Sequence, residues 1–93
     1  MPKSTILVVD DETTIREVVR RCLEHDGFEV REAADGEAAL AAVQRQLPDL
    51  VVLDLMLPGI DGLTLTRRLR RDGHDVPIIM LTARGQASDR ILG

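Results

Sequence analysis

The sequence is poor in cysteine and in aromatic residues: of its 93 residues, one is cysteine, one is phenylalanine, and none is tryptophan or tyrosine. The single Cys22 excludes an internal disulfide and fits a reducing compartment, so we expect the protein to be cytoplasmic. No apolar run approaches the ~18 residues that a membrane-spanning helix needs. The first residues also lack the apolar core and cleavage site of a secretory signal.

Basic residues are fewer than acidic ones. Lysine and arginine together number 12, against 16 acidic residues, which gives a net charge of −4. This balance argues against nucleic-acid binding by this segment. The remaining composition, 44% hydrophobic and 30% charged, is that of an ordinary globular chain. A length of 93 residues accommodates one small domain and not two.

Apolar runs mark the predicted strands. Residues 5–9, 50–53 and 77–81 are continuous runs of β-branched and apolar residues, which predict strands buried on both faces of a parallel sheet. Residues 28–33 alternate between apolar and polar side chains, which predicts a half-covered edge strand. Between these strands, apolar residues recur at helical spacing.

Three helices are predicted in the intervals, and the start of another from Ser88 onward. The first has the inner stripe Ile15, Val18, Val19, Cys22 and Leu23 and ends at Asp26-Gly27. On this stripe Cys22 is expected to be buried and apolar in role. The second helix begins with Asp35 as its N-cap and ends at Pro48, with the inner stripe Ala39, Leu40, Val43 and Leu47. The third carries Leu65 and Leu69 and ends near Asp72-Gly73.

This alternation of strands and helices predicts the α/β class, with right-handed crossovers and a doubly wound parallel sheet covered on both faces. If the strand order is 2-1-3-4, the order reverses between the first and third strands. Ligands of open α/β sheets bind at the carboxyl ends of the strands at such a reversal.

Three acids are predicted to meet at this reversal. Asp10 and Asp11 directly follow the first strand, and Asp54 directly follows the third. Close carboxylates raise one another's pKa values, and a hard cation such as Mg²⁺, which prefers oxygen ligands, relieves the repulsion. The plainer alternative is that each acid caps a helix. Helix capping does not explain Asp54, which precedes the apolar run 55–57 instead of a helix.

Three blocks of sequence resemble the receiver family of two-component signalling, and together they span the whole chain. They are Val8-Val9-Asp10-Asp11-Glu12, the stretch from Asp49 to Gly62 that contains Leu53-Asp54-Leu55-Met56-Leu57-Pro58-Gly59, and Pro77-Ile78-Ile79-Met80-Leu81-Thr82-Ala83. The resemblance implies a flavodoxin-like fold and a phosphorelay in which a sensor histidine kinase donates a phosphoryl group. By position, Asp54 resembles the phosphoacceptor, Asp11 the direct metal ligand, and Asp10 a ligand acting partly through water. The main-chain carbonyl of Met56 would complete the protein's share of the Mg²⁺ shell.

The match is partial where the family reads the phosphoryl group. Thr82 resembles the switch hydroxyl, and Ala83 would contribute a main-chain N–H. Strand 5 and helix 5 of the family, with their lysine and aromatic switch residue, have no counterpart. The only lysine is Lys3, and the only aromatic residue is Phe28. We therefore expect residues 1–93 to form a receiver domain that is incomplete at its C-terminus.

The resemblance implies a phosphoryl acceptor and not an enzyme, with phosphotransfer and dephosphorylation self-catalysed only. The loops at residues 57–62 and 82–84 look most like receivers of winged-helix transcriptional regulators. DNA would then be bound through a separate output domain. The alternative is a non-signalling receiver fragment that acts as a structural or dimerisation module. If the chain truly ends at Gly93, we expect a homodimer or a strand-exchanged, edge-paired dimer through residues 78–81, because an exposed apolar strand edge is an association site.

Two other functions fit the residues less well. A phosphatase of the haloacid-dehalogenase type also uses an aspartate after a strand, but it needs a second acid where Met56 stands. A flavodoxin-like nucleotide or flavin binder needs a glycine- or hydroxyl-rich phosphate loop after the first strand. Without a metal, Asp10, Asp11 and Glu12 would repel a phosphate at that place.

Overall fold

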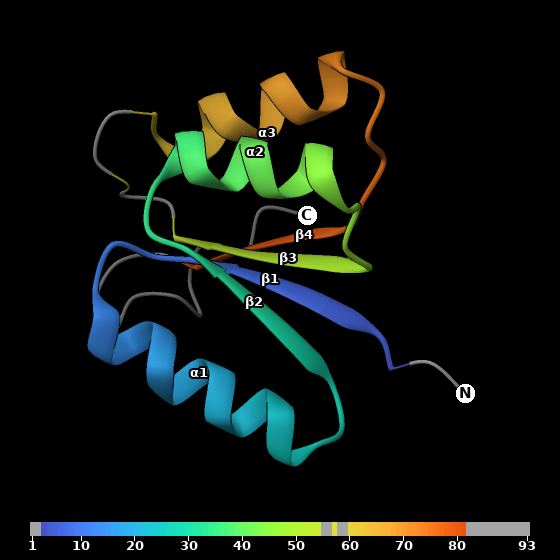
Figure 1. Ribbon diagram of the computed structural model, residues 1–93. Coiled ribbons are helices and arrows are strands. Elements are labelled where there is room, and N and C mark those ends of the chain that lie inside the picture. The colour runs from blue at the N-terminus through green and yellow to red at the C-terminus, as the bar shows by residue number, and fades with distance from the viewer. Residues whose placement is uncertain (1–2, 55–56, 58–59, 82–93) are drawn as a thin grey trace.

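The computed structural model describes residues 3–54, 57 and 60–81, which form one parallel sheet with helices on both faces (Figure 1). The predicted Met56, Thr82 and Ala83 contacts and the helix from Ser88 lie outside these described residues. The elements are β1 (Thr5–Val9), α1 (Thr13–His25), β2 (Glu29–Ala33), α2 (Gly36–Arg45), β3 (Leu50–Asp54), α3 (Gly62–Arg71) and β4 (Ile78–Leu81). This order confirms the predicted alternation of strands and helices.

The strands lie in the order β2-β1-β3-β4, and every neighbouring pair is parallel. The prediction of a doubly wound sheet with order 2-1-3-4 is therefore confirmed. Val9 lies beside Ala33 on one side and beside Leu53 on the other. The register continues to Asp54, which lies beside Leu81 of β4. The carboxyl ends of the central strands consequently meet at one edge of the sheet.

The main core lies between the sheet and the pair α2 and α3, which cover the same face (Figure 1). Because side chains alternate along a strand, every second residue of β1 and β3 points into this layer. Its buried members are Leu7, Val9, Val51 and Leu53 from the strands, Ala39, Leu40 and Val43 from α2, Leu65 and Leu69 from α3, with Ala33, Leu57 and Val76. The predicted inner stripe of α2 is confirmed except for Leu47. That residue is exposed because α2 ends at Arg45, before Pro48.

Of the described helices, only α1 lies on the other face, against β1 and β2 (Figure 1). None of its side chains is buried. Val18, on the predicted inner stripe, is 57% exposed, and Cys22 is exposed as well. The expectation that Cys22 is buried is wrong. Ile15 is exposed too, at 37%, so three of the five predicted inner positions of α1 are wrong. Helix α1 touches the sheet over β1 and β2 and leaves much of its apolar side open within the described part of the chain.

The helix ends explain why the chain turns where it does. The carboxylate of Asp35 accepts a hydrogen bond from the main-chain N–H of Ala38 at 2.7 Å, so the predicted N-cap of α2 is confirmed. Asp61 caps α3 in the same way through the N–H of Thr64 at 2.8 Å. Gly27 and Gly73, with φ of 95° and 86°, form the turns after α1 and α3. No helix among the described residues has the length and apolar character to cross a membrane.

Candidate metal centre

Three carboxylates gather at the carboxyl edge of β1 and β3. Asp10 directly follows β1, Asp11 is the next residue, and Asp54 is the last residue of β3. One carboxylate oxygen from each of the three lies within 4.8 Å of the other two. Because β1 and β3 are neighbouring parallel strands, their ends bring together residues that are far apart in the sequence. The structure thus places together all three of the acids that the sequence singled out.

The electrostatics of this cluster favour a bound cation. Asp10 and Asp54 are only 6% and 7% exposed, whereas Asp11 is exposed to solvent. Burial raises the pKa of Asp10, and the charges of Asp54 and Asp11 raise it further, although a hydrogen bond from the main-chain N–H of Glu12 opposes the shift. Three carboxylate oxygens held this close together suit Mg²⁺, a small hard cation that prefers oxygen ligands.

Helix capping does not account for the two acids after β1. The N-cap residue of α1 is Glu12, and no side chain makes a capping hydrogen bond there. The carboxylate of Asp10 instead accepts the N–H of Glu12 at 2.9 Å, within its own turn. By contrast, Asp61 does cap α3. The N–H and hydroxyl of Thr64 lower the pKa of Asp61, as expected for a stabilised carboxylate. The capping acids and the clustered acids are therefore distinct sets.

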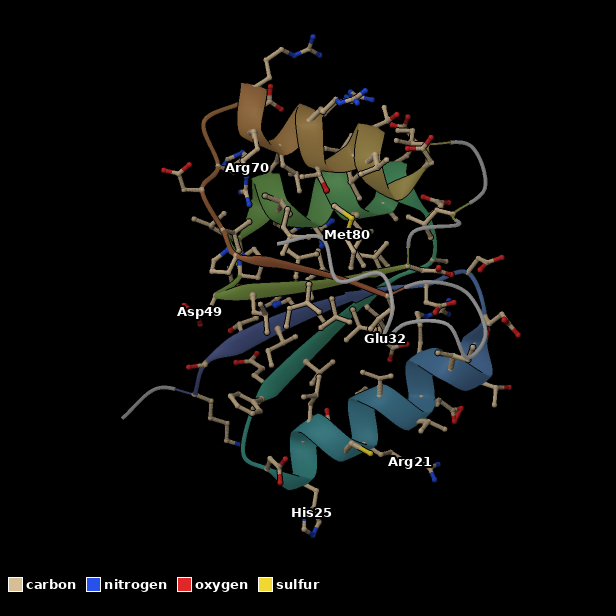
Figure 2. The ribbon with its side chains drawn as sticks, turned by 180° about the vertical axis from the view of Figure 1, so that it is seen from behind. Arg21, His25, Glu32, Asp49, Arg70 and Met80 are labelled. Carbon is tan, nitrogen blue, oxygen red and sulfur yellow. The ribbon has the colours of Figure 1, made fainter. Side chains whose placement is uncertain are left out.

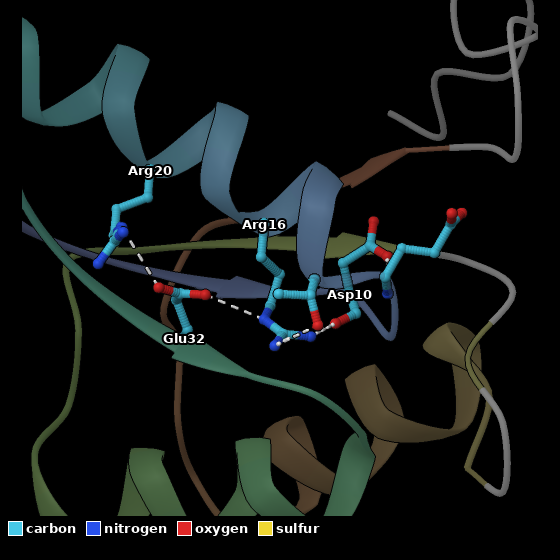
Figure 3. Close-up of polar contacts among 6 residues, drawn as sticks. Asp10, Arg16, Arg20 and Glu32 are labelled. Atoms are coloured by element: carbon cyan, nitrogen blue, oxygen red, sulfur yellow. Dashed lines mark hydrogen bonds and ion pairs between the residues drawn. The ribbon is translucent and has the colours of Figure 1, made fainter.

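The main chain of Asp10 is held on both sides. Its N–H donates to the carbonyl of Ala33 on β2 at 3.1 Å. Its carbonyl accepts a hydrogen bond from Nη1 of Arg16 on α1 at 2.6 Å (Figure 3). The turn that carries Asp10 and Asp11 is thus tied to a neighbouring strand and to the following helix.

The sequence analysis missed Arg16 and its partner Glu32. Nε of Arg16 donates to Oε1 of Glu32 at 3.0 Å, and Nε of Arg20 lies 3.3 Å from Oε2 of the same carboxylate (Figure 3). Glu32 belongs to β2, against which α1 lies, and Figure 2 shows it on the sheet near α1. The available signal was modest: two arginines four residues apart on one helix, and an acid in the next strand. Such spacing is common on solvated helix faces and does not by itself indicate a site.

The arrangement can therefore hold a divalent cation and offer a carboxylate to an electrophile beside it. Carboxylate nucleophiles form acyl phosphates with phosphoryl donors. In such transfers, positioning and charge neutralisation supply most of the rate. The described residues place the acids needed for this chemistry at the position where parallel α/β sheets bind ligands.

Comparison with known proteins gives a consistent result. Residues 6–92 match the profile of the response regulator receiver domain. The chain is 52% identical over its whole length to a protein from Porphyridium aerugineum named as a probable transcriptional regulator, ycf27, and 49% identical over 95% of its length to the response regulator MprA of Mycolicibacterium vanbaalenii. It spans 38% of the length of each of these two relatives.

Solved structures show the same likeness. The response regulator protein TrrA from Thermotoga maritima, crystallised in complex with Mg²⁺ and BeF, superposes with a TM-score of 0.82 at 42% identity. That alignment covers 92% of this chain and 76% of the other. The N-terminal domain of a response regulator receiver protein from Methanoculleus marisnigri superposes with a TM-score of 0.83 at 38% identity, covering 91% and 73% of the two chains.

Proposed function

Because this chain belongs to the response regulator receiver family, we propose that it accepts a phosphoryl group on Asp54 from a sensor histidine kinase, with Asp10 and Asp11 holding Mg²⁺ beside it. The observation that carries the proposal is the meeting of these three carboxylates within 4.8 Å at the edge of β1 and β3. Asp54 is the proposed acceptor because it ends a central strand and matches the family's acceptor position.

The proposed reaction is a direct transfer between two side chains. An oxygen of the Asp54 carboxylate attacks the phosphorus of a kinase phosphohistidine. The new O–P bond forms as the P–N bond breaks, and the electron pair of that bond returns to the histidine. The product is an acyl phosphate. The chain acts here as the acceptor, not as an enzyme with a separate substrate.

Magnesium would neutralise charge on the equatorial phosphoryl oxygens. The buried and mutually repelling acids at this edge suit such an ion, and Asp11, being exposed, is the one best placed to meet it from solvent. We assign the remaining contacts from the family resemblance: the main-chain carbonyl of Met56 to the metal shell, and the hydroxyl of Thr82 and the N–H of Ala83 to the phosphoryl group.

The wider partners follow from the relatives. One is named a transcriptional regulator and another a response regulator, and both are much longer than this chain. We propose that this receiver controls a DNA-binding output domain and does not itself contact DNA. The net charge of −4 supports the proposal that this segment does not itself contact DNA. We propose that the kinase meets this chain in the cytoplasm, which the single cysteine favours.

The test is phosphorylation by a small donor. The chain is incubated with Mg²⁺ and acetyl phosphate, and its intact mass is compared with that of Asp54→Asn. We expect the mass of one phosphoryl group to be added to the wild type only, and only when Mg²⁺ is present. Beryllofluoride, which mimics the acyl phosphate, should change the ¹H–¹⁵N spectrum of the wild type in the same Mg²⁺-dependent way.

Asp49→Asn is the matched control. Asp49 precedes β3 at its amino end, as Figure 2 shows, so this variant makes the same charge change at the opposite end of the same strand. Asn retains the oxygen that accepts the N–H of Thr5, a bond of 2.7 Å in the wild type. Asp49→Asn should be phosphorylated like the wild type. Equal labelling of Asp54→Asn, or loss in both variants, would contradict the assignment.

One observation favours the structural alternative. Among the described strands β4 is an outer one, and its Ile79 is 49% exposed. An outer strand with an exposed apolar side chain can pair with a second copy. A folded wild type that takes up no phosphoryl group, and whose mass by light scattering is that of a dimer, would support a dimerisation module. A phosphorylated monomer would exclude it.

A further inference from the structure

We infer that Arg16, which contributes no ligand atom, is a positioning residue that sets the Asp10–Asp11 turn for cation binding. The inference rests on the proposed metal site. It is carried by the contacts of the Arg16 guanidinium, which joins α1 to the turn and to β2 (Figure 3).

Besides a long hydrogen bond of 3.5 Å from Nη2 to the hydroxyl of Thr13 within α1, the guanidinium makes two contacts outside its helix. Nη1 donates to the carbonyl of Asp10 at 2.6 Å, and Nε donates to Oε1 of Glu32 at 3.0 Å. The Arg16 side chain is 14% exposed and that of Glu32 is 27% exposed, so the arginine end of the pair is the more buried of the two. A planar guanidinium with donors in a fixed fork can span two acceptors in defined directions, which a lysine ammonium on a flexible stem does less well.

Glu32 is also close to a second arginine. Nε of Arg20, one helical turn farther along α1, lies 3.3 Å from the second oxygen of Glu32 but makes no hydrogen bond among the described residues, so the hydrogen-bonded link from α1 to the turn runs through Arg16 and not through Arg20. The residue after Glu32 is Ala33, whose carbonyl accepts the N–H of Asp10. The peptide groups on both sides of the Asp10 Cα are therefore tied to this one segment of β2, directly on one side and through Arg16 on the other.

This arrangement leaves the Asp10 carboxylate few ways to move. Its main chain is fixed by Arg16 and Ala33, and its Oδ1 accepts the N–H of Glu12. Groups that orient a metal ligand from behind typically change metal affinity by 10- to 100-fold when removed. Releasing the Asp10 carbonyl should loosen the turn that presents both Asp10 and Asp11.

The sign of the effect separates this inference from simple electrostatics. Arg16 is a cation close to a proposed cation site, so by Coulomb's law its removal alone should strengthen Mg²⁺ binding. Positioning predicts the reverse, because a loosened turn no longer presents its oxygens together. Arg20 provides the matched case: it is a cation on the same helix with the same Glu32 partner, and no contact between it and Asp10 is observed.

The experiment measures the Mg²⁺ dissociation constant of the chain by isothermal titration calorimetry for the wild type, Arg16→Gln, Arg16→Lys and Arg20→Gln. We expect about a tenfold weaker Mg²⁺ affinity for Arg16→Gln. The loss for Arg16→Lys should be intermediate, because lysine keeps the charge but lacks the planar guanidinium that reaches two acceptors. Arg20→Gln should bind as tightly as the wild type or slightly more tightly. Arg16→Gln binding at least as tightly as the wild type, or Arg20→Gln losing as much affinity, would overturn the inference.

A second readout needs no metal. Without Mg²⁺, the amide of Glu12 should exchange with solvent faster in Arg16→Gln than in Arg20→Gln, because its acceptor on Asp10 is no longer held. If the wild type binds no Mg²⁺ but this difference appears, the proposed metal function fails while the positioning role stands. If the amide exchanges equally in both variants, the positioning role fails whatever the metal does. Far-UV circular dichroism shows whether each variant is folded. Arg16→Lys is the conservative variant that tests the inference if Arg16→Gln fails to fold.

Discussion

Replacing Asp10 by asparagine should stabilise the chain without Mg²⁺ and destabilise it relative to the wild type with Mg²⁺. The substitution keeps the shape and the Oδ1 acceptor for the Glu12 N–H, and it removes one charge from the cluster. The clustered carboxylate oxygens lie within 4.8 Å of one another. At that separation and an effective dielectric constant of about 20, two unit charges repel by ~3.5 kcal/mol.

The measured gain should be smaller than this repulsion. Asp11 is exposed, so solvent and salt weaken the repulsion between its charge and that of Asp10. A hydrogen bond to a neutral amide oxygen is also weaker than one to a carboxylate by about 1 kcal/mol. We therefore expect Asp10→Asn to raise the free energy of unfolding by about 1–2 kcal/mol in EDTA. Mg²⁺ at 100 times its Kd stabilises the wild type by ~2.7 kcal/mol, and the variant, lacking one proposed ligand, should gain much less.

The assay is urea unfolding followed by circular dichroism at 222 nm, since the chain has no tryptophan or tyrosine for fluorescence. Because the pKa of Asp10 is raised in the folded chain, its contribution favours the folded state at low pH and is lost as the pH rises through that raised pKa. The advantage of the variant in EDTA should accordingly shrink in acid. Asp75→Asn, at an exposed position before β4, is the control for net charge. A variant less stable than the wild type in EDTA, or one that responds fully to Mg²⁺, would refute the reasoning.

Two further predictions concern the scaffold. Leu65→Ala should lower the free energy of unfolding by ~2–5 kcal/mol, because Leu65 is 0% exposed. Leu63→Ala, on the same helix at 43% exposure, should lower it far less. Equal losses in urea unfolding would contradict the assigned core. The second concerns Asp61, whose pKa the N–H and hydroxyl of Thr64 lower: its stabilisation should be present above the ordinary pKa of aspartate and be lost as the pH falls through the lowered value. In Asp61→Asn, the free energy of unfolding should fall less as the pH is lowered than it does in the wild type. The same fall in both proteins would argue against the cap.

The strands and two of the helices could be predicted closely because their signals are local. Every position in the run Thr5 to Val9 is β-branched or apolar, and the run is buried on both faces. Asp35 precedes a helical pattern, and it caps the helix. The predicted burial failed for Ile15, Val18, Cys22 and Leu47, which are exposed. It failed as well for β4, where Ile79 is 49% exposed. Helical spacing reports which side of a helix is apolar, whereas exposure depends on where the helix ends and on what lies against it.

By itself, the sequence determined the alternation of strands and helices, the strand order through the family resemblance, and the placement of Asp10 and Asp54 at strand ends. These follow from short-range patterns and from the rule that parallel strands end at a common edge. Only the tertiary structure decided how close the carboxylates come, why the pKa of Asp10 rises, and that Arg16 holds the Asp10 carbonyl. The physical reason is that these properties depend on desolvation and on the relative orientation of β1, β2 and α1, which packing sets.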